Sequence, residues 1–155
     1  MMLWNLALAV LWMLITNLFS FANLVVGMVI GFAVLAFLGA PLGGRVYARQ
    51  VWGALGLLVF FLKELVVANI KMAGFTLGPL SRLRPGIVAV PLEVMSDDAV
   101  TVLANLITLT PGTLSVEVAP DRRTLYVHAM DVADPAGLVA EIKRGFERRV
   151  LEVIK

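Results

Sequence analysis

Residues 1–44 read MMLWNLALAVLWMLITNLFSFANLVVGMVIGFAVLAFLGAPLGG and contain no Asp, Glu, Lys, Arg or His. The first charged side chain is that of Arg45. So long an apolar stretch is not soluble in water, whereas the hydrocarbon interior of a bilayer accepts it. The stretch therefore predicts a membrane protein with an α-helical N-terminal part.

Two apolar runs divide this stretch and predict transmembrane helices over about 2–18 and 22–40, with a tight turn between them. The most apolar part of the first run, Leu3 to Ile15, extends only ~20 Å as a helix, short of the ~30 Å hydrocarbon core. Including Met1 and residues 16–19 brings it close, so we expect a short span with local thinning of the bilayer. In the second run, Gly27 and Gly31 have the spacing that lets another helix approach closely. Two interpretations stay open: packing against the first helix or a partner subunit, or merely the frequency of glycine in membrane helices.

A third apolar run, over about 50–75, differs because it carries Lys63, Glu64 and Lys71. At helical spacing these charges form a narrow stripe on an otherwise apolar helix. The helix either spans the bilayer with its stripe toward a partner subunit, or lies at the cytoplasmic interface. Its length favours spanning and the basic residues on both sides disfavour it, so both alternatives stay open. In either case the three charged residues are candidates for an interface or an ion path.

Charge is unevenly distributed along the chain. Residues 45–84 carry six basic and one acidic side chain, a net charge of +5, whereas residues 85–155 carry seven basic and ten acidic ones, a net charge of −3. Basic residues beside a membrane mark its cytoplasmic side and attract anionic lipid. We therefore expect a cytoplasmic C-terminal domain and no nucleic-acid partner. Anionic lipid is expected near Arg45, Arg49, Arg82 and Arg84.

Beyond a membrane region at 1–77 and a linker at 78–86, residues 87–155 predict a small α+β domain. Strand patterns cover 87–94, 113–118 and 123–132, and helical patterns cover 97–109 and 135–154. The order β-α-β-β-α with short connections predicts a three-stranded sheet with both helices on one face. The last helix is expected to bury a stripe of Val139, Ile142, Phe146, Val150 and Val153.

Catalytic chemistry has little support in the sequence. The chain contains no cysteine, which excludes disulfides, thiolate nucleophiles and cysteine-based metal sites, and it has no P-loop, GxGxxG or GxSxG motif. His128 is the only histidine and is expected on the strand face away from the helices, while Asp97 and Asp98 begin a helix and are expected to cap it. We therefore expect no catalytic residue, cofactor or metal, and no enzymatic activity.

The run LANLITLTPGTL at 103–114, followed by LYVHAMD at 125–131, resembles the E subunit of the multisubunit Na⁺/H⁺ antiporters of the Mrp, Mnh or Pha type. Shorter matches are the Trp-x-x-x-Thr-Asn pattern at 12–17, KEL at 63–65 and AN at 68–69, so the resemblance covers nearly the whole chain. The signature residues are Asn105, Thr108, Thr110, Pro111, Gly112 and Thr113.

The resemblance implies an accessory subunit of the cell membrane, needed for the assembly and activity of a large hetero-oligomeric cation/proton antiporter. Its partners would be the other antiporter subunits, of which the large ones, similar to those of complex I, would move the ions. The signature at 105–113 is expected to form either a packing hinge or a surface that presents Asn105 and the threonines to a neighbour. An alternative is the equivalent small subunit of a membrane-bound hydrogenase or another complex I-related redox complex. A stand-alone membrane enzyme is disfavoured, because no catalytic groups cluster in the sequence.

Overall fold

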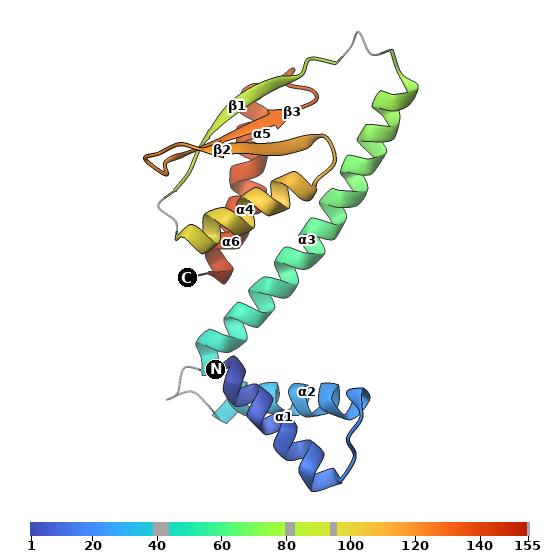
Figure 1. Cartoon of the computed structure of the whole chain (residues 1–155), viewed down its shortest axis with the longest axis vertical. Coiled ribbons are helices and arrows are strands. Elements are labelled where there is room, and N and C mark those ends of the chain that lie inside the picture. Colours follow the sequence, from blue (N-terminus) through green and yellow to red (C-terminus); the bar gives the residue numbers. More distant parts are fainter. Residues whose placement is uncertain (39–43, 80–82, 94–95, 155) are drawn as a thin grey trace. The chain divides into compact units, whose positions relative to one another are not determined.

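The computed structural model describes residues 1–38, 44–79, 83–93 and 96–154 (Figure 1). The chain forms two compact units, Met1–Trp52 and Gly53–Lys155, which are described separately. A helical N-terminal part is followed by a small domain built on an antiparallel sheet, as the sequence predicts.

The first unit contains the helices α1 (Met2–Thr16) and α2 (Phe21–Leu38). Asn17 ends α1 in the left-handed conformation, with φ 52° and ψ 29°, which asparagine tolerates better than most residues. The side chain of Asn23 then ties the two helices together: its Oδ1 accepts a hydrogen bond from Trp12 Nε1 at 3.0 Å, and its Nδ2 donates to Thr16 Oγ1 at 2.7 Å. Thr16, Asn17 and Asn23 therefore serve the hairpin turn.

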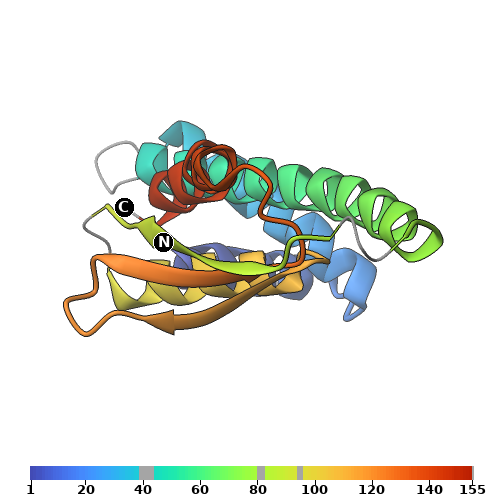
Figure 2. The ribbon, with the colours of Figure 1, turned by 90° about the horizontal axis from the view of Figure 1, so that it is seen from above.

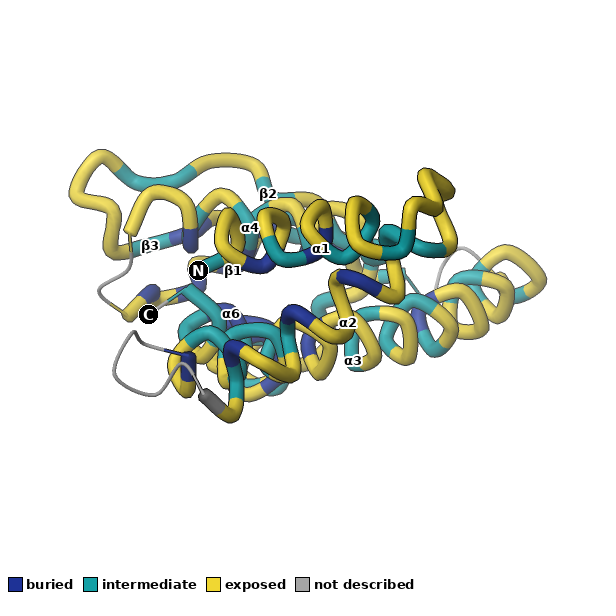
Figure 3. The backbone as a smooth tube through the Cα atoms, turned by 90° about the horizontal axis from the view of Figure 1, so that it is seen from below, coloured by how far each residue is buried: buried dark blue, intermediate teal, exposed yellow. Residues whose placement is uncertain are grey.

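The two helices pack through their small residues. A Cβ added to Gly27 would lie 2.9 Å from the Cα and carbonyl oxygen of Ala9, and one added to Gly31 would collide with the Asn5 side chain. Asn5 is buried and donates a hydrogen bond to the Tyr47 hydroxyl at 2.9 Å. Away from this contact most large apolar side chains of α1 and α2 are exposed, as the exposed and buried positions in Figure 3 show.

The third helix, α3 (Gly44–Leu77), has 34 residues and begins earlier than the predicted residue 50. Arg45 and Arg49 therefore lie in its first turns instead of preceding it. Among the described helices, α3 alone is both long and apolar enough to cross a membrane, whereas α1 and α2 are apolar but shorter. Residues 53–77 of α3 belong to the second compact unit, although the sequence prediction assigned them to the membrane region.

In the described part of the second unit, β1 (Gly86–Pro91), β2 (Thr113–Val118) and β3 (Thr124–Ala129) form one antiparallel sheet in the order β1-β3-β2. Val88 pairs with Val127 in the β1–β3 register, and the β2–β3 register shifts between Ser115 and Glu117. The strand that was expected at 123–132 is shorter, because the chain bends after Ala129.

Helices follow β1 and β3 in the predicted order. Within the predicted capping segment 96–98, Ser96 caps α4 (Asp97–Leu109) by accepting a hydrogen bond from Ala99 N at 3.3 Å, and Asp97 and Asp98 lie in the first turn, where negative charge is favourable. Asp134 caps α5 (Pro135–Ile142), which continues through a π-helical turn, η3 (Lys143–Glu147), into α6 (Arg148–Val153).

The core lies between the sheet and these helices. Leu103 and Ile107 of α4 pack with Leu125 and Val127 of β3 and with Val150 of α6, all nearly inaccessible to solvent. The predicted stripe on the last helix is confirmed: Ile142, Phe146 and Val150 are buried, and Val139 and Val153 pack against them. The outer face of the sheet stays exposed at Ile87, Leu114 and Tyr126.

Helix α3 adds a further layer to this unit. Its Leu57 is a member of the core cluster, and Phe60 and Phe61 pack against that cluster. Seen from above in Figure 2, the red helix α5–α6 and helix α3 lie on the same side of the sheet. The middle of an apolar helix thus completes the core of the α/β domain.

Replacement of Leu103 by alanine should lower the free energy of unfolding of the second unit by about 2–5 kcal/mol, because the cavity left behind cannot collapse fully. Leu109→Ala in the same helix is the matched control, since Leu109 is 62% exposed, and should change stability by under about 0.5 kcal/mol. Hydrogen exchange of the β3 amides in the full-length chain in detergent measures the change in the free energy of unfolding for both variants. An equal loss of stability from the two substitutions would contradict the burial of Leu103 in this core.

Candidate functional site

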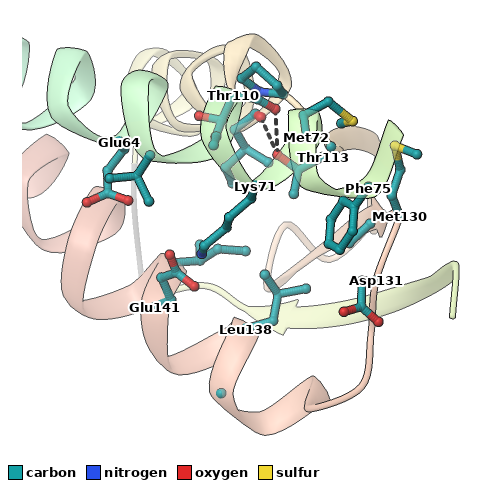
Figure 4. A pocket seen from close by; sticks show the side chains of 18 of the residues that line it. Glu64, Lys71, Met72, Phe75, Thr110, Thr113, Met130, Asp131, Leu138 and Glu141 are labelled. Carbon is teal, nitrogen blue, oxygen red and sulfur yellow. Dashed lines mark hydrogen bonds between the residues drawn. The ribbon is translucent and has the colours of Figure 1, made fainter. Parts of the chain in front are cut away.

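A cavity of about 600 Å³ opens between α3, the α4–β2 corner, the end of β3 and the first turns of α5 (Figure 4). Its walls are mostly apolar, with Met72 and Phe75 of α3 facing Leu138 of α5 and Met130 after β3. All of these elements belong to the second compact unit. Two segments that the sequence singles out, the charged stripe of α3 and the signature, meet at this cavity.

Five charged residues line the cavity. They are the acids Glu64, Asp131, Asp134 and Glu141 and the base Lys71, which gives the lining a net charge of −3. Asp134 is engaged as the cap of α5, where its Oδ1 accepts a hydrogen bond from Gly137 N at 2.9 Å. Glu64 has a side chain only 16% exposed and lies 3.7 Å from the Lys63 ammonium, which points into solvent with 71% exposure.

The predicted stripe is therefore divided by the fold. Glu64 and Lys71 line the cavity, whereas Lys63 is outside it and serves as the ion-pair partner of Glu64. In Figure 4 the Lys71 side chain extends from α3 toward the carboxylate of Glu141. Glu141 was not a candidate on sequence grounds, because it lies on the exposed side of the last helix.

The signature forms the corner between α4 and β2. Thr113 Oγ1 donates to the carbonyl oxygens of Ile107 at 2.7 Å and Thr110 at 3.0 Å, and Thr110 Oγ1 donates to Leu106 O at 2.9 Å. The backbone N–H groups of Thr110 and Thr113 also donate to Ile107 O at 3.1 Å and Thr110 O at 3.2 Å, so the hydroxyls add further hydrogen bonds to the carbonyls at the end of α4. Gly112 has φ +92°, a conformation that L side chains rarely adopt, and the Met72 methyl of α3 lies 3.2 Å from the position of an added Cβ.

The other polar signature residues divide into two groups. Thr108 Oγ1 accepts a hydrogen bond from Ser115 N at 3.1 Å and so holds β2 against α4. Asn105 is exposed on α4, and its side chain makes no hydrogen bond within the described residues. The threonines therefore make hydrogen bonds within the fold, whereas Asn105 is exposed at the surface of α4.

A second contact fixes α3 to the helix that follows β3. Phe60 packs edge-on against Phe146, with ring centroids 5.2 Å apart and planes at 73°. The guanidinium carbon of Arg149 lies 3.9 Å from the centroid of the Phe60 ring, a favourable position for a cation over an aromatic face. Gly145 permits this approach, since an added Cβ would lie 2.9 Å from Phe60 Cζ.

Sequence reasoning missed a buried ion pair at the π-helical turn. Glu147 is 1% exposed; its carboxylate accepts hydrogen bonds from Lys143 Nζ at 2.7 Å and from Glu93 N at 2.8 Å. Lys143 Nζ also donates to Pro91 O at 2.9 Å. The signal in the sequence was the i,i+4 spacing of Lys143 and Glu147, which by itself is typical of an exposed helix face.

The other residues singled out in the sequence do not line the cavity. His128 is partly exposed on the outer face of the sheet, and Arg45, Arg49 and Arg84 are at least partly exposed. Arg82 lies outside the described residues. Within the part of the chain that the structure describes, no three His, Cys, Asp or Glu side chains come together as metal ligands. The cavity is suited to holding an apolar group that bears a charge.

An apolar helical hairpin, a long third helix and a small α/β domain with an open cavity are typical of a small subunit of a membrane complex. The model of the family described as Na⁺/H⁺ ion antiporter subunit (MNHE) matches residues 5–153. The chain is 38% identical over 151 residues to the E subunit of the Na⁺/H⁺ antiporter of Alkalihalophilus pseudofirmus, covering 97% of this chain and 96% of that protein. It is 36% identical to the E subunit of Bacillus subtilis, covering 96% and 94%. The chain belongs to the family of E subunits of the multisubunit Na⁺/H⁺ antiporters.

Two solved structures resemble the fold. A chain in the Mrp complex of Dietzia sp. DQ12-45-1b has a TM-score of 0.52 and 32% identity, covering 66% of this chain and 94% of that one. A chain of an archaeal membrane-bound sulfane sulfur reductase has a TM-score of 0.61 over 99% of this chain and 98% of its own, with 24% identity. The second likeness concerns the fold alone.

Replacement of Gly112 by alanine should destabilise the second unit by about 1–2 kcal/mol, because its left-handed backbone is unfavourable for an L side chain. Gly56→Ala is the control, since an added Cβ there meets nothing within 4 Å. In a helix interior the same change should stabilise by about 0.5–1 kcal/mol. In detergent, the unfolding temperature of the full-length chain should fall for Gly112→Ala and rise for Gly56→Ala. Shifts of the same sign would contradict the left-handed conformation of Gly112.

Proposed function

We propose that this chain is an accessory, non-catalytic subunit that supports the assembly and activity of a multisubunit Na⁺/H⁺ antiporter and does not itself move ions. The observation that carries this proposal is the absence of any ionisable side chain in residues 1–44. Proton or sodium paths through a membrane need ionisable groups within it. An accessory role fits a helical hairpin that can anchor but offers no such groups.

The hairpin α1–α2 serves as the membrane anchor in this proposal. Its outward residues are large and apolar, with Leu3, Phe21 and Phe37 more than 80% exposed. Such surfaces are stable among acyl chains and unfavourable in water. As helices, α1 and α2 extend ~22 and ~27 Å, so the flanking residues or a thinner bilayer must complete the crossing. Gly27 and Gly31 support the close approach of α1 and α2 within the anchor.

For α3 we propose a position at the cytoplasmic surface. Phe60 lies at the middle of the 34-residue helix, where a spanning helix would meet the bilayer midplane. Arg149 stacks on this residue, and the Lys143–Glu147 pair lies in the adjacent turn of η3. A charged side chain at the midplane costs about 2.5–3.5 kcal/mol on insertion scales. A surface position keeps these groups and the α/β domain in the cytoplasm.

Charge supports the same arrangement. Arg45 and Arg49 in the first turns of α3 and Arg84 beyond its end are exposed, and Arg82 adds a further positive charge to the sequence after α3. Each basic residue near an anionic cytoplasmic leaflet contributes about 1 kcal/mol of attraction. In this arrangement Lys63, Glu64 and Lys71 belong to an interface with partner subunits and not to an ion path, since the cavity that Glu64 and Lys71 line belongs to the α/β unit.

A role in a complex I-related redox complex is the second candidate. The observation in its favour is the likeness of nearly the whole fold to a chain of the archaeal sulfur reductase. That likeness carries 24% identity, whereas the bacterial antiporter subunits reach 36–38% over nearly the full chain. The antiporter is therefore the function that the residues support best.

Deletion of this chain should abolish the assembled antiporter or reduce its activity strongly, because the other subunits lose a docking surface. The measurements are native electrophoresis of the complex in mild detergent and Na⁺-dependent proton exchange in everted membrane vesicles. Re-expression of the full chain is the control and should restore both. A deletion strain with an intact complex and normal exchange would contradict the proposal.

A further inference from the structure

Three charged side chains in the cavity have no partner within the described residues. The side chains of Lys71, Asp131 and Glu141 make no ion pair or hydrogen bond there. They project into or border a space of about 600 Å³ whose walls are largely apolar. Charged groups next to apolar surface gain stability when an opposite charge approaches in a site from which water is excluded.

The charge of the lining restricts what can occupy this space. Four acids against one base give the lining a net charge of −3, which repels lipid phosphates and other anions. A bare metal ion lacks a converging set of ligands among the described residues. Apolar walls combined with net negative charge are complementary to an apolar segment that carries a basic side chain.

We propose that this cavity binds a segment of another subunit of the complex, an apolar stretch of chain that carries one Lys or Arg. Met72, Phe75 and Leu138 receive its apolar side chains, and its cation lies between Asp131 and Glu141. The rigid α4–β2 corner, fixed by Thr110 and Thr113, gives the cavity a constant shape. This inference rests on the proposed function, because it requires that the chain is part of an assembled antiporter.

A photo-crosslinking residue in place of Ala133 tests the occupant in the purified antiporter complex. Ala133 lines the cavity and is exposed, so the substitution leaves every charge in place. The matched control has the same residue in place of Ala89, which is exposed on the outer face of the sheet. Mass spectrometry should identify, from position 133, an apolar peptide of another subunit that contains Lys or Arg, with about tenfold more adduct than from position 89.

Charge reversal provides a second, independent readout in the same complex. Glu141→Lys should lower the adduct from position 133 and the retention of the chain in the complex by about tenfold, because like charges then face each other across the interface. Glu117→Lys, an exposed reversal on β2, should leave both unchanged.

The outcomes separate this inference from the proposed function. A wild-type chain that does not copurify with other subunits overturns both. If the wild-type chain copurifies, the inference alone is overturned by an adduct with lipid, by an adduct with a second copy of this chain, or by no adduct from position 133. Equal effects of Glu141→Lys and Glu117→Lys also overturn it.

Discussion

Phe60 of α3 packs against Phe146 and beneath Arg149, and the arrangement of the second unit depends on this contact. An aromatic pair contributes about 0.5–1.5 kcal/mol beyond the area it buries, and a cation over a ring contributes a further ~0.5–2 kcal/mol. Leu57, one turn earlier, completes the core of the α/β domain. The contact therefore makes part of an apolar helix a structural component of the α/β domain.

In the proposed function, this helix joins the membrane anchor to the surface that binds partner subunits. The chain from Met1 to Trp52 forms the apolar unit, and α3 continues from it into the unit that holds the cavity. Because α3 forms one wall of the cavity, Lys71 and Glu64 reach the signature corner only when the helix is packed on α5–α6. A subunit that supports assembly needs a surface of this kind, formed by residues that do not react and held in constant shape by a rigid corner.

The sequence predicts much of this fold, because its signals are local. The charge-free opening stretch, the Asp134-Pro135 helix start and the alternation of Leu125, Val127 and Ala129 each follow from hydrophobicity or backbone geometry. The packing of α3 on the domain could not be predicted, since its apolar face has the same composition whether lipid or protein covers it. Glu141 and the buried pair of Lys143 with Glu147 were missed because helical spacing suggests exposure, and only the tertiary fold brings Glu93 to Glu147.

The central claim is that α3 lies at the membrane surface with the α/β domain, and the accessibility of its two ends tests this most directly. The chain has no native cysteine. Any labelling of a variant with one cysteine in place of the exposed Val46 or Leu77 therefore comes from that position alone. A membrane-impermeant maleimide should label both positions in everted vesicles and neither position in right-side-out vesicles. Labelling of the two positions from opposite sides of the membrane would show that α3 crosses it and would contradict the account.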